Sequence, residues 1–204
     1  MSQLNEVSQP IICDAYQEPT RHWVIERGRP AVTVEGRREA CYYYRPPGRS
    51  TGVEQADEIG TRFTLDLVNE IRKRVASWRA AGFPGVTGVT GELLAYWNRP
   101  DRERRLFFCQ REAIETVIFL VEAREDFRQG LVIPRDEPGL FARYACKMAT
   151  GTGKTAVMAG IAAWSILNKV ADRGARRFSA VVLVVCPNVP IRARLEALKP
   201  EHGE

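Results

Sequence analysis

The stretch MATGTGKT, residues 148–155, decides the fold of this chain. Its two glycines, Gly151 and Gly153, let the backbone take positive φ and bring its amides close to a ligand without a Cβ in the way. A long apolar helix is predicted to follow at once, so successive N–H groups would form a concave anion nest at the positive end of that helix. The pattern predicts a loop that binds phosphate groups.

The side chains at the end of the stretch suit a nucleotide and its metal ion. Lys154 has the length to reach terminal phosphates, and the hydroxyl of Thr155 can ligate Mg²⁺. The Walker A pattern has glycine where this sequence has Met148, which indicates a particular subclass of phosphate loop. The alternative, a Gly-Lys-Thr turn without a ligand, fits less well with the strand-loop-helix context predicted around it. We expect a nucleoside triphosphate to contact Thr150, Gly151, Thr152, Gly153, Lys154 and Thr155.

The segments on either side of the loop predict an α/β fold. Residues 141–149 are predicted to form a short strand, and residues 156–170 the helix after the loop. Residues 180–186 contain no polar side chain, which is typical of a central parallel strand covered on both faces. Strand, helix and strand would make one right-handed βαβ unit. The sequence therefore predicts a parallel sheet of the P-loop type.

The first hundred residues carry weaker signals. Residues 1–60 are rich in arginine and proline and predict an irregular arm. Arginines interleaved with the tyrosines at 42–44 would suit a nucleic-acid surface, but a solvated arm remains an alternative. Residues 61–82 and 91–97 predict two amphipathic helices, the second capped by Thr90. Together we expect an accessory helical element over residues 61–100.

Composition narrows the classes of protein to which the chain can belong. A net charge of +5 suits a polyanionic partner. Five scattered cysteines and two histidines offer no zinc-binding spacing, so we expect reduced thiols. No run of about 18 apolar residues is present, which argues against a membrane span. These features predict a soluble, cytoplasmic protein.

Three motifs in order resemble those of superfamily 2 helicases, the DEAD/DEAH-box group. Residues 149–155 resemble their motif I, and Gln110, preceded by aromatic residues, resembles their Q motif. Residues 184–188, at the end of the apolar run, resemble motif Ia. The nearest likeness is to the Res-type subunits, the ATP-dependent DNA translocases of type III restriction systems. Further stretches similar to that group are residues 19–23, 93–97 and 106–113.

The resemblance implies a RecA-like fold with ATP and Mg²⁺ as cofactors. Residues 101–204 would be the N-terminal part of the first ATP-binding domain, preceded by the accessory region. The amide of Gln110 would read the adenine edge, because it can both donate and accept hydrogen bonds. Either Phe107 or Phe108 would stack on the base. Lys154 would neutralise the β- and γ-phosphates, and Thr155 would hold the metal.

The resemblance also implies DNA as a partner. Pro187 and Asn188 lie where the family contacts the DNA backbone, and Arg192 or Arg194 would add a phosphate contact. On charge pattern alone, the two arginines fit a solvated helix equally well. A methyltransferase (modification) subunit is a candidate second partner. No membrane partner is expected.

Parts that a complete motor needs are absent from the sequence. No Asp-Glu pair follows an apolar strand after residue 185, and no second lobe supplies arginine fingers. We therefore expect the N-terminal part of a larger helicase or restriction-enzyme subunit, with a truncated sheet, which binds ATP weakly and does not turn it over. The alternatives are a non-motor P-loop nucleotide-binding module, such as a kinase or switch, and a truncated remnant without activity of its own.

Overall fold

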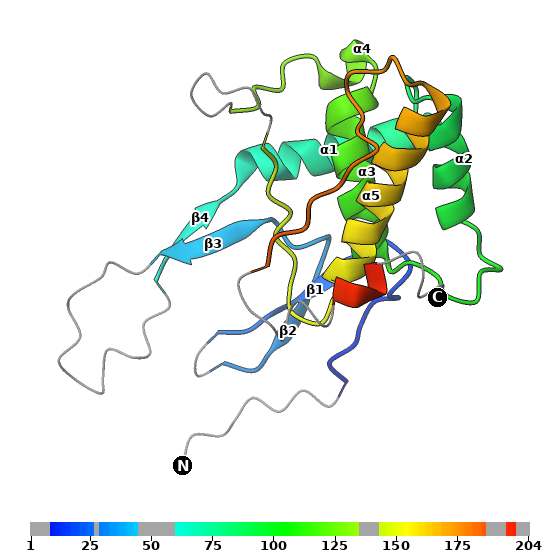
Figure 1. Cartoon of the computed structure of the whole chain (residues 1–204). Helices are drawn as coiled ribbons and strands as arrows, with labels where there is room; N and C mark the ends of the chain where they lie inside the picture. Colours follow the sequence, from blue (N-terminus) through cyan, green and yellow to red (C-terminus); the bar gives the residue numbers. More distant parts are fainter. Residues whose placement is uncertain (1–8, 27–28, 45–59, 135–142, 187–194, 199–204) are drawn as a thin grey trace. The chain divides into compact units, whose positions relative to one another are not determined.

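The computed structural model describes residues 9–26, 29–44, 60–134, 143–186 and 195–198. The chain divides into two compact units, Met1–Lys73 and Arg74–Glu204. The division falls inside helix α1 (Asp66–Ala80), and not at residue 60 or 100, where the sequence pattern suggested boundaries. Figure 1 shows the elements of both units, which are taken separately below.

The first unit contains two antiparallel strand pairs. Strand β1 (Arg21–Val24) pairs with β2 (Val32–Glu35), and β3 (Cys41–Tyr44) pairs with β4 (Thr61–Thr64). All four are rich in β-branched or aromatic residues, which pack well on a pleated surface. The rings of Tyr42 and Phe63 stack across the second pair, with centroids 5.4 Å apart.

Helix α1 begins later than the sequence pattern predicted. Residues 61–64 form β4, so the helix starts at Asp66, whose carboxylate suits the positive end of the helix. One turn on, the side chain of Asn69 accepts from the amide of Ala40 at 2.8 Å and donates to its carbonyl at 3.2 Å. This double contact fixes the start of α1 to the chain just before β3.

The second unit is helical in the part of the chain that the structure describes. Helix α2 (Gly88–Trp97) is capped by Thr87, whose hydroxyl accepts from the amide of Thr90, so the helix begins before the predicted cap at Thr90. The helix predicted to run on to about Arg128 is interrupted at Ala123 and Arg124. The elements are α2 (Gly88–Trp97), α3 (Phe108–Glu122), α4 (Glu125–Arg128), α5 (Lys154–Ala171) and a 3-10 turn (Glu196–Leu198).

The core of this unit lies between α3 and α5, which run side by side (Figure 1). A Cβ on Gly160 of α5 would lie 2.5 Å from Cδ1 of Ile114 on α3, so only glycine permits this approach. Trp78 packs edge-on against Phe83 and Phe119. Among the described residues, the apolar ones with at most 1% exposure are Val75, Trp78, Leu94, Ile114, Ile118, Phe119 and Ala123.

The parallel sheet stays a prediction. Among the described residues, 143–149 and 180–186 belong to no strand, and the two antiparallel pairs of the first unit are the sheets present. Leu183 and Val185 are 85% and 84% exposed. Apolar composition predicted a covered strand, but a strand needs hydrogen-bonded neighbours, and no described segment supplies them to this run.

Candidate functional site

The loop predicted to bind phosphate has the backbone that such a site needs. Gly151 and Gly153 have φ of +81° and +74°, a region that other residues seldom enter. Gly153 is the residue before α5, so the loop leads directly into the positive end of an 18-residue helix. In the part of the chain that the structure describes, the amides of residues 151–155 donate to no backbone carbonyl. Among the described residues, no backbone carbonyl competes with an anion for these amides.

Gln110 connects the start of α3 to this loop. Its side-chain nitrogen Nε2 donates to the carbonyl of Thr152 at 3.0 Å, and its Oε1 accepts from the amide of Phe107 at 2.9 Å. The residue is only 7% exposed. The bond from Phe107 belongs to a capping box at the start of α3, whereas a glutamine that merely faced solvent would not show the contact to Thr152. Two segments 42 positions apart in the sequence therefore meet at one amide group.

Lys154 lies against the loop itself. Its Nζ donates to the carbonyl of Ala149 at 2.8 Å, and the hydroxyl of Thr152 donates to the same oxygen at 2.8 Å. Lys154 is exposed and Thr155 half-buried. A phosphate oxygen could replace the carbonyl as the acceptor of the lysine, since a charged acceptor forms the stronger bond.

The two phenylalanines before Gln110 have different surroundings. Phe107 is 40% exposed, whereas Phe108 is 4% exposed. The guanidinium groups of Arg79 and Arg111 both lie over the ring of Phe108, at 5.4 and 5.5 Å from its centroid. Of the two rings, Phe107 is therefore the one that keeps surface for a planar ligand.

A buried ion cluster lies beside Phe108, and sequence reasoning missed it. Glu115 is fully buried, and its Oε2 lies 2.6 Å from Arg79, with Arg111 at 3.8 Å from Oε1. Burial raises the pKa of Glu115 above its ordinary value, although the neighbouring arginines oppose the shift. Burial also lowers the pKa of Arg111. The signal that could have found the cluster is an acidic residue within the apolar stripe of α3.

A second buried polar cluster joins α2, α3 and α5. Oε1 of Glu122 accepts from the indole of Trp164 at 2.6 Å and from the hydroxyl of Thr90 at 2.7 Å, and Oε2 accepts from the amide of Thr87 at 2.8 Å. Asn168 donates to Thr90 at 2.9 Å. The members come from three segments: Thr87 and Thr90 from the start of α2, Glu122 from α3, and Trp164 and Asn168 from α5. Sequence spacing could not bring these three segments together. The cluster fixes the C-terminal half of α5, whereas the loop predicted to bind phosphate precedes the N-terminal end of the helix.

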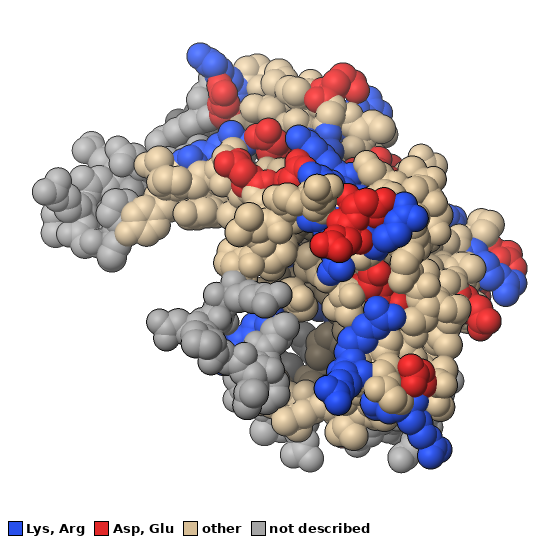
Figure 2. All heavy atoms as spheres, turned by 90° about the horizontal axis from the view of Figure 1, so that it is seen from above, with Lys and Arg blue, Asp and Glu red and all other residues tan. Residues whose placement is uncertain are grey.

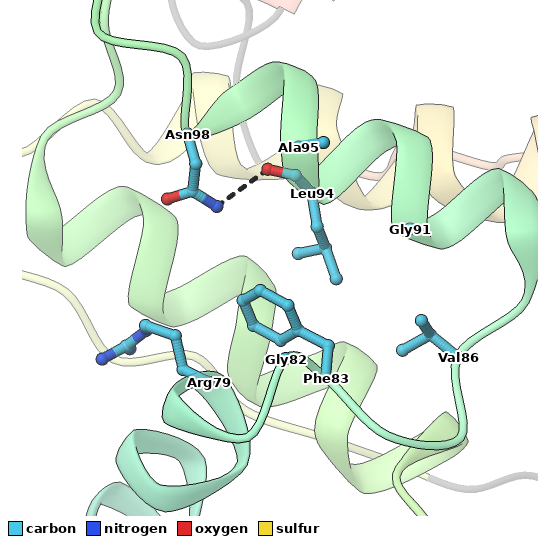
Figure 3. A pocket seen from close by; sticks show the side chains of 8 residues that line it. All are labelled: Arg79, Gly82, Phe83, Val86, Gly91, Leu94, Ala95 and Asn98. Carbon is cyan, nitrogen blue, oxygen red and sulfur yellow. Dashed lines mark hydrogen bonds between the residues drawn. The ribbon is translucent and has the colours of Figure 1, made fainter.

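The apolar cavity of the second unit does not include the loop. It has a volume of about 260 Å³ and lies between the end of α1 and α2 (Figure 3). Asn98 donates to the carbonyl of Leu94 at its edge, and Arg79 reaches its rim while bonded to Glu115. The lining residues are Arg79, Gly82, Phe83, Val86, Gly91, Leu94, Ala95 and Asn98.

The residues predicted to contact DNA cannot be placed. Pro187, Asn188, Arg192 and Arg194 lie outside the described residues. On the face drawn in Figure 2, acidic and basic side chains are interleaved. Within the described ranges, no group of three His, Cys, Asp or Glu side chains could hold a metal ion.

No helix in the described part of the chain is long and apolar enough to cross a membrane.

Comparison of the chain with protein-family models, with curated proteins and with solved structures finds no match.

Proposed function

We propose that the chain binds ATP with Mg²⁺ at the loop of residues 150–155. The contact between Gln110 and Thr152 carries the proposal, because it joins the aromatic-glutamine segment to the phosphate loop. The two motifs lie 42 positions apart in the sequence, and a chance Gly-Lys-Thr turn gives no reason for them to meet. The positive φ of Gly151 and Gly153 supports the same reading.

The loop offers a role for each residue at the triphosphate. The amides of the loop would donate to phosphate oxygens at the positive end of α5. Lys154 would leave the carbonyl of Ala149 for the β- and γ-phosphates, and Thr155 would ligate Mg²⁺. The partly exposed ring of Phe107 is the candidate to stack on the base.

The wider role that we propose is the ATP-binding part of a DNA helicase or translocase of the Res type. It rests on the order of the three motifs and on the resemblance that they carry. A RecA-like parallel sheet, DNA contacts at Pro187, Asn188 and Arg192, and a methyltransferase partner belong to that proposal. We expect no ATP turnover by residues 1–204, because an Asp-Glu motif and arginine fingers are needed to complete the reaction.

Titration calorimetry with ATP and Mg²⁺ tests the binding site. Lys154→Ala should weaken binding by at least roughly tenfold, because charge-assisted bonds to phosphate are lost. Lys147→Ala is the matched control, since it removes an exposed lysine from the same approach to the loop and should leave binding unchanged.

Three results would count against the proposal. Equal binding by both variants would place the nucleotide elsewhere. No binding by the folded wild-type chain would exclude a nucleotide site in residues 1–204. Hydrolysis above the level of Lys154→Ala would contradict the expected lack of turnover.

A further inference from the structure

Both polar atoms of the Gln110 amide have partners within the protein. Its oxygen accepts from Phe107, its nitrogen donates to Thr152, and the residue is only 7% exposed. A group whose main role is to read a base would be expected to direct its donor and acceptor outward, toward the ligand. This one directs both into the protein.

The bond to Thr152 has a consequence for the next amide. In a trans peptide the C=O of one residue and the N–H of the next point in opposite directions. The carbonyl of Thr152 faces Gln110, so the N–H of Gly153 is turned away from Gln110. That amide is one of the loop donors without a backbone acceptor in the described chain. By fixing the direction of the Thr152 carbonyl, Gln110 also fixes the direction of the Gly153 N–H.

Gly153 fits closely against the same side chain. A Cβ at this position would lie 2.1 Å from Nε2 of Gln110, and the residue has φ of +74°. With a Cβ at residue 153, the amide end of Gln110 would have to shift away from the backbone. The contact is specific to one orientation of the Thr152–Gly153 peptide.

From this geometry we infer that Gln110 is a positioning residue that orients the Thr152–Gly153 peptide for phosphate. The inference rests on the proposed triphosphate site and deepens it. Gln110 supports the affinity for the phosphate chain whatever base is attached, including a polyphosphate with no base at all. The pair Gln110 and Thr152 acts on the ligand only through the loop backbone.

The test is the affinity of the full chain for ATP, GTP and inorganic tripolyphosphate, each with Mg²⁺. Gln110→Met keeps the length of the side chain but removes both hydrogen bonds of the amide, the one to Thr152 and the one from Phe107. We expect all three affinities to fall by a similar factor, roughly 3- to 10-fold, as the neutral hydrogen bond that holds the loop carbonyl is lost. Gln129→Met, at an exposed position after α4, is the matched control and should change none of them. A fall for ATP alone would overturn the inference and make Gln110 an adenine reader.

A ligand-free measurement separates this inference from the proposed function. Gln110→Glu keeps an oxygen that accepts from Phe107 but has no donor for Thr152. We expect lower ¹⁵N order parameters for the amides of Gly151 and Gly153 than in the wild type, with order in the rest of α5 unchanged. Unchanged loop amides would overturn the inference, even if ATP binds. Loosened amides in a chain that binds no triphosphate would support the positioning contact and reject the nucleotide site.

Discussion

Burial and ion pairing have opposite effects on the pKa of Glu115. Its side chain is fully buried, and Arg79 donates to it at 2.7 Å. Desolvation disfavours the carboxylate, while the two arginines favour it. Burial is the larger effect, so the pKa of Glu115 lies above its ordinary value of 4.5.

This shift predicts a pH dependence of stability. Because folding raises the pKa, the carboxyl favours the folded state most below pH 4.5, and that contribution is lost as the pH rises through the raised pKa. Glu115→Gln removes the titrating group. The unfolding free energy of the wild type minus that of Glu115→Gln should therefore decrease with rising pH, measured by urea unfolding. An increase would mean that pairing with Arg79 outweighs burial.

Gly153 illustrates how one residue meets two demands. Positive φ alone favours glycine there, and the sequence pattern was sufficient to predict that demand. The second demand is space for the amide of Gln110, which only the folded chain reveals. A substitution at Gly153 would therefore disturb both the backbone and its neighbour.

At the scale of elements, the approach of α5 to α3 depends on Gly160. Glycine inside a helix costs roughly 0.5 to 1 kcal/mol relative to alanine. At this position, however, an alanine would place its Cβ 2.5 Å from Cδ1 of Ile114. Ile114 is 1% exposed, so the alanine would overpack a buried contact. Overpacking of a buried contact costs about 1 to 3 kcal/mol, so it outweighs the gain in propensity.

A double-mutant cycle measures this contact. Gly160→Ala should lower the unfolding free energy by up to about 2.5 kcal/mol, the difference between overpacking and propensity. Ile114→Val removes Cδ1, so the same glycine substitution should cost less in that background. Chemical denaturation of the four proteins gives the coupling. Additive effects would show that the helices do not meet at these two residues.

At the scale of the whole chain, the apolar run of residues 180–186 differs most between the environment that the sequence predicts and the exposure in the structure. The sequence predicts a covered strand over residues 180–186, whereas Leu183 and Val185 are more than four-fifths exposed. A continuous exposed apolar segment of this kind is uncommon and often marks an interaction site.

Leu183→Lys distinguishes the two environments. If Leu183 is exposed in the folded chain, the unfolding free energy should change by less than about 0.5 kcal/mol. Ile118→Ala, at a fully buried position, is the control and should lose about 2 to 5 kcal/mol. A loss at Leu183 as large as at Ile118 would place the run in a covered sheet.

Elements that form through interactions between residues close in the sequence were predicted more closely than elements that depend on distant segments. Helix α5 and the turns at Gly151 and Gly153 arise from local spacing and backbone freedom, so the sequence predicted them closely. The start of α1, the cap of α2 and the break after Glu122 were missed. Each depends on a neighbour in another segment. Ala40, for example, bonds to Asn69 of α1.

The sequence alone determined the positive-φ turn at Gly151 and Gly153 and the helix that follows, and it predicted phosphate binding there by Lys154 and Thr155, because each is a property of adjacent residues. It also singled out Gln110. Only the tertiary structure decided what Gln110 touches, which phenylalanine keeps an exposed ring, and that Glu115 and Glu122 are buried. These features join residues far apart in the chain. They follow from the packing of α3 against α5, which no local pattern encodes.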